Sequence, residues 1–180
     1  MFDLDTFVGD CAAALGESDS RRAIREVLAR AMAEPSSVAG SLDHARAGLH
    51  VVYRSPELTV LNVVWAPLMS LPPHDHRMWA AIGVYAGQED NSFYRRQTEG
   101  LAVSGGKELR TGDVVLLGDD TIHAVSNPNR QHTGAIHVYG GDFVDTPRSQ
   151  WDPETLEEQP YDLEGILKRF AVANSQAEAR

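Results

Sequence analysis

Residues 112–127 read GDVVLLGDDTIHAVSN, and this stretch decides the fold class. Short aliphatic and β-branched runs are interrupted by Gly112-Asp113 and Gly118, a pattern typical of antiparallel strands joined by tight turns. A histidine, His123, stands inside the second of these runs. Farther upstream, residues 72–76 read PPHDH and supply two more histidines within a short segment.

The same pattern extends over residues 50–145, which are rich in Val, Leu, Ile and Tyr between Gly, Pro, Asp and Asn. It predicts a barrel or sandwich of short strands. The segment 88–91, Gln-Glu-Asp-Asn, is interpreted as a turn between strands. The predicted strands are residues 58–65, 80–86, 92–96, 101–104, 113–117 and 134–139.

The flanking regions have helical periodicity instead. Up to residue 48, apolar residues such as Phe7 and Cys11, and later Ile24 and Leu28, recur at the spacing of one helix face. We therefore expect Cys11 to be a packed core residue. Residues 146–180 are predicted to wrap the surface and to include a short helix that starts near Leu163. The whole chain, 1–180, is predicted to form one domain.

Composition limits the function classes. The 180 residues carry a net charge of −10, which disfavours binding to nucleic acid or to anionic membranes. The first residues, MFDLDTFVGD, lack the basic start and apolar run of a signal peptide, and the single cysteine permits no intrachain disulfide. We expect a soluble cytoplasmic protein, either a monomer or a small homo-oligomer, that acts on a small molecule.

Three histidines are candidate metal ligands. Residues two apart in a strand share a face, so His74 and His76 can present two imidazoles to one ion. His123 could supply a third. Imidazole suits several transition metals, and the ligand type therefore leaves Fe, Ni, Zn, Mn and Cu open.

These segments resemble the two sequence motifs of cupins. The resemblance implies a mainly β fold: a double-stranded β-helix, or jelly-roll barrel, with N-terminal α-helices and a short C-terminal helix. The Glu that usually serves as a fourth ligand would fall at Ala80 and is missing. The alternative is a barrel that has lost its metal and keeps the histidines as core residues. The matching residues are His74, His76 and Gly87 in the first motif and Gly112, His123 and Asn127 in the second.

A narrower resemblance covers about residues 50–145. HDHRMWAAIGVYAGQEDNSFYRR (74–96), GDDTIHAVSNP (118–128) and GAIHVYGGDF (134–143) look like cysteine dioxygenase-type cupins. This likeness implies a mononuclear non-heme Fe²⁺ site and oxidation of a small thiol to a sulfinate with O₂. It assigns catalytic roles to Tyr139 and His137. The family's serine before this histidine is replaced by Ala135, which we expect to shorten the hydrogen-bond relay.

The substrate-binding residues are the least determined part of the site. The resemblance places an arginine upstream of the histidine pair, for which Arg54 is the nearest candidate, with Arg95 or Arg96 as alternatives. Trp79 is predicted to line the pocket. Two other functions stay open: cleavage of a C–C bond in a diketone or enolate, and non-enzymatic binding of a small molecule. A basic anchor near the metal would favour a small carboxylated thiol, and an all-apolar pocket would favour a diketone.

Overall fold

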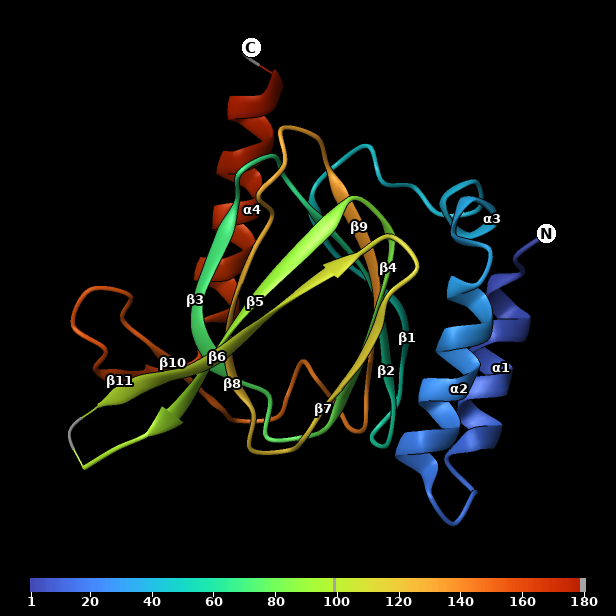
Figure 1. Ribbon diagram of the computed structural model, residues 1–180, viewed down its shortest axis with the longest axis horizontal. Coiled ribbons are helices and arrows are strands. Elements are labelled where there is room, and N and C mark those ends of the chain that lie inside the picture. Colours follow the sequence, from blue (N-terminus) through green and yellow to red (C-terminus); the bar gives the residue numbers. More distant parts are fainter. Residues whose placement is uncertain (99, 179–180) are drawn as a thin grey trace.

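The computed structural model describes residues 1–98 and 100–178 and places helices at both ends of a β-structure (Figure 1). Each of the first two helices begins at an aspartate whose carboxylate accepts a hydrogen bond from a backbone N–H three residues on, Asp3 from Thr6 and Asp19 from Arg22. The helices are α1 (Leu4–Ala14), α2 (Ser20–Met32), α3 (Pro35–Ala39) and α4 (Leu163–Glu178).

The strands form two antiparallel sheets. One sheet has the order β1-β2-β9-β4-β7, and the other has the order β11-β10-β3-β8-β5-β6. The strands are β1 (Gly48–Arg54), β2 (Thr59–Trp65), β3 (Ser70–Asp75), β4 (Ala80–Ala86), β5 (Gln88–Arg96), β6 (Leu101–Arg110), β7 (Val114–Leu117), β8 (Ile122–Ser126), β9 (Thr133–Tyr139), β10 (Ser149–Trp151) and β11 (Glu158–Pro160).

The strand pairing is nested. β5 pairs with β6, β4 with β7, β3 with β8 and β2 with β9, each time antiparallel, so that the chain behaves as one long hairpin rolled up on itself. Successive pairs fall alternately in the two sheets. This arrangement is the double-stranded β-helix, and it confirms the fold class predicted from the sequence.

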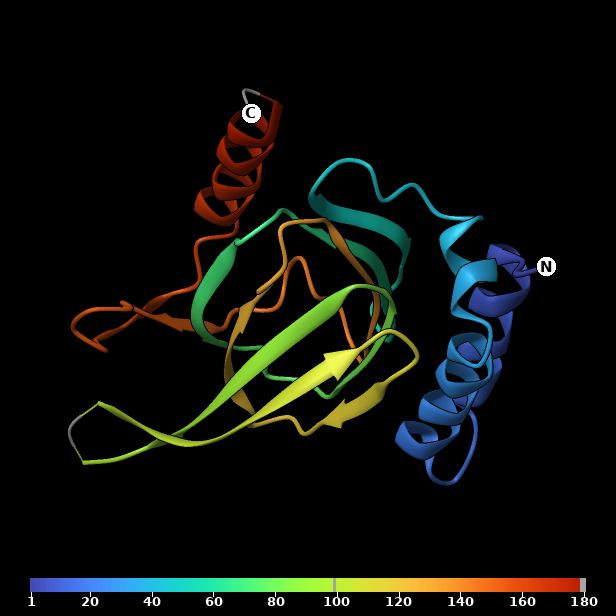
Figure 2. The ribbon, with the colours of Figure 1, turned by 45° about the horizontal axis from the view of Figure 1, so that its top comes forward.

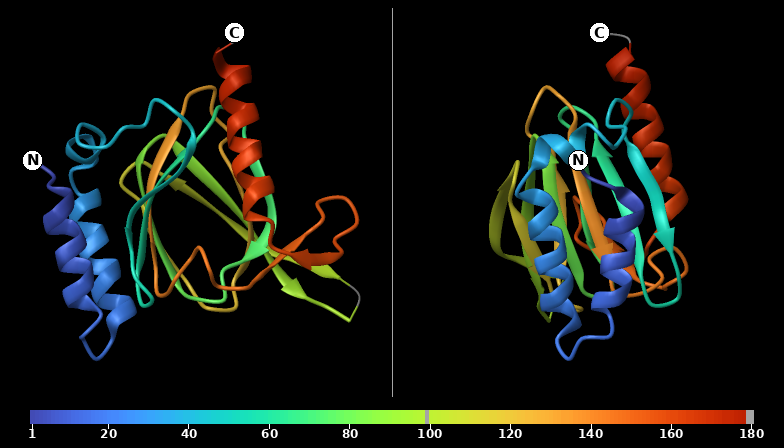
Figure 3. Two further views of the ribbon diagram at one scale, coloured as in Figure 1. Left: turned by 180° about the vertical axis from the view of Figure 1, so that it is seen from behind. Right: turned by 90° about the vertical axis from the view of Figure 1, so that its right-hand side faces the viewer.

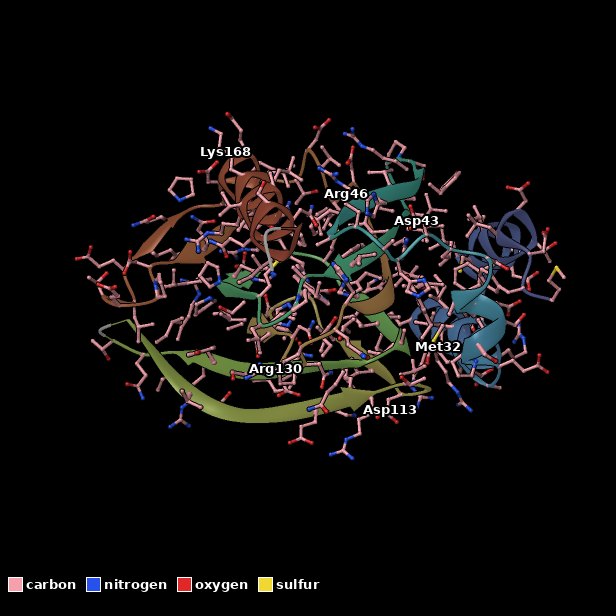
Figure 4. All side chains as sticks on the ribbon, turned by 90° about the horizontal axis from the view of Figure 1, so that it is seen from above. Met32, Asp43, Arg46, Asp113, Arg130 and Lys168 are labelled. Atoms are coloured by element: carbon pink, nitrogen blue, oxygen red, sulfur yellow. The ribbon has the colours of Figure 1, made fainter. Side chains whose placement is uncertain are left out.

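Side chains alternate between the two faces of each strand and form two hydrophobic cores. In β9, Ala135 and Tyr139 point between the sheets, whereas Ile136 and Val138 face α1 and α2. Figure 4 shows Met32 on the side of α2 that faces the barrel, where it packs over Gly83 of β4. A Cβ at Gly83 would lie 2.8 Å from the Met32 Cγ, so this close approach requires glycine.

Cys11 lies fully buried in the core between the helices and the sheet, as predicted. The last helix, α4, lies on the opposite side of the barrel from α1 and α2 (Figures 2 and 3). Its Phe170 stacks on Trp65 with ring centroids 5.5 Å apart. Asn174 of α4 exchanges two hydrogen bonds with the backbone of Ala47. The helix extends to Glu178 and is therefore longer than the short helix that was predicted.

Most predicted strands are present, with shifted ends. The segment 88–91 is the clear error, because it is the beginning of β5 and not a turn. Gly87 alone makes the change of direction between β4 and β5 with a φ of 81°, which leaves the following residues extended. Within the described residues, no helix is both long enough and apolar enough to span a membrane.

Candidate metal centre

The three predicted ligands come together on one sheet. His74 lies near the end of β3 and is paired directly across from His123 of β8. His76 follows β3 by one residue, and its ring faces the same side as that of His74, with centroids 5.1 Å apart. Asp75, between them, points the other way and accepts a hydrogen bond from the backbone N–H of Ser149. The alternation predicted for the motif is therefore confirmed.

The nitrogen atoms fit a single ion. One ligand atom from each of His74, His76 and His123 lies within 4.8 Å of the other two. The Nε2 atoms of His76 and His123 are 3.2 Å apart. Two donors each about 2.1 Å from an ion are separated by roughly 3.0–3.4 Å in octahedral or tetrahedral geometry. The cluster could therefore hold a metal ion without a large rearrangement.

The protonation of these rings also suits coordination. The Nδ1 of His74 donates to the carbonyl of Pro72 at 2.9 Å, which leaves its Nε2 lone pair directed elsewhere. Burial lowers the pKa of His74 to about 4, and it holds the pKa values of His76 and His123 well below their ordinary range. Neutral imidazole is the form that binds metals.

No carboxylate joins the cluster among the described residues. Ala80 is fully buried at the position where cupins usually carry Glu. Asn127, the last residue of the second motif, has a structural role instead: its amide donates to the carbonyls of Ala66 and Gln131 and joins two loops. A divalent ion held here would keep its full positive charge and up to three open positions.

Tyr139 and His137 also face the cluster, as predicted. The Tyr139 ring is 5.0 Å from that of His76, and burial raises the pKa of its hydroxyl well above the ordinary value. The hydroxyl lies 3.0 Å from Nδ1 of His137. On the other side of the imidazole, Nε2 donates to the carboxylate of Glu89 at 3.1 Å, a partner that sequence reasoning missed because 88–91 was interpreted as a turn.

Arg148 is the second residue that sequence reasoning missed. Its guanidinium lies between the rings of Phe143 and Tyr161, 4.1 and 3.9 Å from their centroids, and it is only 7% exposed. Nη1 donates to the carbonyls of Phe143 and Thr146. Within the described part of the chain, its buried Nε and Nη2 atoms make no hydrogen bond of ordinary geometry, and the guanidinium lies close enough to the Tyr161 hydroxyl to oppose the rise in its pKa that burial causes. Burial of such a group costs free energy unless a ligand accepts its remaining hydrogen bonds.

The predicted substrate residues lie elsewhere. Arg54 is held outside the cavity by a bidentate pair with Asp142, both bonds 2.8 Å long, and by Asp145. Trp79 packs over Gly140 in the core between the helices and the sheet. Neither residue lines the cavity at the histidines, because Arg54 lies at the end of β1 beside two acidic residues and Trp79, just before β4, packs in the core on the helix side of the sheet. Of the two alternative anchors, Arg95 is exposed and Arg96 pairs with Glu158.

The cavity beside the three histidines is small. Its volume is about 20 Å³, which is room for an ion or a water-sized group. A larger ligand requires side chains of the wall to move. Phe143 and Tyr161 are wall residues that come from outside the barrel strands. A larger hollow, about 750 Å³, lies along α4 and contains none of the site histidines.

No protein-family model matches the sequence. An uncharacterized protein with a double-stranded β-helix domain from Klebsiella pneumoniae is 13% identical, with 61% of this chain and 82% of that chain covered and a TM-score of 0.48. An RmlC-like cupin family protein from Methanocaldococcus jannaschii is 10% identical, with 56% and 85% covered and a TM-score of 0.47.

The nested strand order itself defines the class. The protein has a cupin-type double-stranded β-helix fold, with a buried cluster of three histidines that could bind a metal ion.

Proposed function

We propose that this protein is a mononuclear non-heme iron dioxygenase that oxidises a small, carboxylate-bearing thiol to its sulfinate. The overall reaction adds both atoms of dioxygen to sulfur, RSH + O₂ giving RSO₂H, and needs no external reductant. The observation that carries the proposal is the buried, incompletely bonded guanidinium of Arg148, which is separated from the histidine cluster by single aromatic rings.

The ligand set supports an anionic substrate. Iron bound by three imidazoles would supply an uncompensated positive charge and the redox chemistry that dioxygen requires. A thiolate and a carboxylate on one small molecule match this charge and that of Arg148. The rings of Phe143 and Tyr161 contact the guanidinium on both faces, and movement of these wall residues would bring its N–H groups within reach of a substrate carboxylate.

Tyr139 and His137 handle the proton in this proposal. A thiol that binds as its anion must lose a proton, and the Tyr139 hydroxyl oxygen is placed to accept it. The tyrosine passes its own proton to Nδ1 of His137, 3.0 Å away. The S–H bond and the original O–H bond break, while a new O–H bond and an N–H bond form. The imidazolium that results lies beside the carboxylate of Glu89.

Oxygen uptake by the purified, Fe²⁺-loaded protein tests the proposal. We expect uptake and a sulfinate product, identified by mass spectrometry, with 3-mercaptopropionate or cysteine. Propane-1-thiol is the matched control without a carboxylate, and we expect it to react at least about 100-fold less efficiently, since a buried charged hydrogen-bonded pair is lost. If oxygen is taken up with pentane-2,4-dione but with none of the thiols, the proposal is overturned in favour of C–C bond cleavage.

A further inference from the structure

One buried carboxylate, that of Glu89, is hydrogen-bonded directly to His137 and is linked through Asn91 to His123. Glu89 is 0% exposed and lies on the inward face of β5 together with Asn91. Its Oε2 accepts hydrogen bonds from Nε1 of Trp65 at 2.8 Å and from Nε2 of His137 at 3.1 Å. Its Oε1 accepts from Nδ2 of Asn91 at 3.1 Å. Burial opposes a charge on Glu89, but His137, Trp65 and Asn91 together hold its pKa below the ordinary value.

The first arm of this network reaches a metal ligand. An ionised carboxylate can only accept hydrogen bonds, so the NH₂ end of the Asn91 amide must face Glu89. The carbonyl end, Oδ1, therefore faces His123, whose Nδ1 lies 2.7 Å away and must carry the hydrogen. The Nε2 of His123 is then left with a lone pair, and this is the atom that lies 3.2 Å from Nε2 of His76.

The second arm reaches the tyrosine. Because Glu89 accepts from Nε2 of His137, the neutral imidazole has its lone pair on Nδ1. That nitrogen accepts the hydrogen of the Tyr139 hydroxyl, and the phenol oxygen keeps its lone pairs for a ligand. Ala135, where a serine was expected from the family resemblance, is fully buried. The relay is not cut short, since a residue of a different strand completes it.

We propose that Glu89 is a positioning residue that fixes the tautomers of both His123 and His137, and so prepares the metal site and the proton acceptor together. The part that concerns Tyr139 rests on the proposed function. The part that concerns His123 rests only on the metal cluster. The ligand set itself lacks a carboxylate. Glu89 supplies one that is linked to His123 through Asn91, and it orients that histidine without occupying a coordination position.

Glu89→Gln tests this because an amide has one accepting end and one donating end. A glutamine that turns its oxygen toward Trp65 and His137 keeps two hydrogen bonds, and its NH₂ end then meets the NH₂ end of Asn91. The Asn91 amide must rotate, and His123 must move its hydrogen to Nε2. We expect long-range ¹H–¹⁵N NMR of the metal-free variant to show this tautomer change at His123, with His137 unchanged.

The second readout is the affinity for Zn²⁺ or Co²⁺, measured without any substrate. We expect roughly a 10- to 100-fold loss in Glu89→Gln. Asp90→Asn is the matched control: it removes the same charge from the neighbouring position, where the side chain is directed away from the site and accepts a hydrogen bond from Gln88. We expect wild-type tautomers and wild-type affinity in this control.

Asn91→Leu separates the two arms and serves if Glu89→Gln does not fold. It should weaken metal binding as Glu89→Gln does and leave the His137 tautomer intact. A wild-type His123 tautomer together with wild-type metal affinity in a folded Glu89→Gln variant would overturn the proposal, and so would wild-type metal affinity in a folded Asn91→Leu variant. A changed His123 tautomer in a protein that oxidises no thiol would support the role of Glu89 and refute only the proposed function.

Discussion

The substitution Arg148→Met tests whether Arg148 binds the substrate or only stabilises the structure. Methionine keeps a long flexible side chain between Phe143 and Tyr161 and can make favourable sulfur–aromatic contacts. The substitution removes two hydrogen bonds to backbone carbonyls, those of Phe143 and Thr146, and two cation–π contacts. These interactions are worth about 1.5–3 kcal/mol per charged hydrogen bond and about 1–2 kcal/mol per buried cation–π contact.

The same substitution also relieves a penalty. Among the described residues, the buried Nε and Nη2 atoms of Arg148 lack a well-oriented partner, at about 1–3 kcal/mol each, and the desolvation penalty of the buried charge, on the order of several kcal/mol, is removed with them. The gains and losses are of similar size, and replacement of a buried charge by an apolar side chain is often neutral. We therefore expect the free energy of unfolding in denaturant to change by no more than about 2 kcal/mol.

The effect on activity should be much larger. Loss of a buried, charged hydrogen-bonded anchor costs about 2–5 kcal/mol, so kcat/KM for a carboxylated thiol should fall roughly 30- to 5000-fold. Activity with propane-1-thiol should not fall. Arg54→Met is the control, because Arg54 pairs with Asp142 outside the cavity.

The assay is initial-rate oxygen uptake normalised to bound iron, with urea unfolding of the same preparations. A loss of more than about 4 kcal/mol of stability, with equal kinetic losses for the carboxylated thiol and propane-1-thiol, would refute the reasoning. Arg148 would then be a structural residue that supports Phe143 and Tyr161.

Three further predictions concern the histidines and the tyrosine. Single replacement of His74, His76 or His123 by alanine should abolish stoichiometric metal, measured by elemental analysis, because each removes one of three donors; full metal at wild-type affinity in any variant would exclude that residue as a ligand. In the metal-free protein, burial lowers the pKa of His74 to about 4, so the unfolded chain binds its proton first as the pH falls. The contribution of the neutral His74 ring to the free energy of unfolding should therefore be fully present above about pH 6.5 and be lost as the pH falls toward 4. Urea titrations of the metal-free protein should show a decrease of about 3 kcal/mol from His74 alone, and unchanged stability across this range would contradict the prediction. Tyr139→Phe should keep the metal and the fold and lower turnover roughly 10- to 1000-fold in oxygen uptake, and unchanged turnover would make Tyr139 only a packed aromatic.

The sequence by itself was enough to predict the fold class and the three histidines that come together in the structure. Alternating apolar residues and turn residues at fixed positions specify short antiparallel strands, because strand periodicity and turn conformation are local properties. The histidine pair at 74 and 76 needs only strand alternation to share a face, and Tyr139 and His137 follow the same rule. Local rules failed at 88–91, where polar residues on an inward strand face have the composition of a turn.

Tertiary structure alone decided the residues that serve these ligands. Glu89 on β5 of one sheet contacts His137 on β9 of the other, and Arg148, from a segment beyond the barrel, packs behind the wall residues Phe143 and Tyr161. Arg54 was excluded in the same way, by two aspartates far along the chain. Contacts between segments distant in sequence depend on how the hairpin rolls up and on where the tail then packs. Buried polar groups must find partners in that final arrangement, and no local pattern specifies which ones they find.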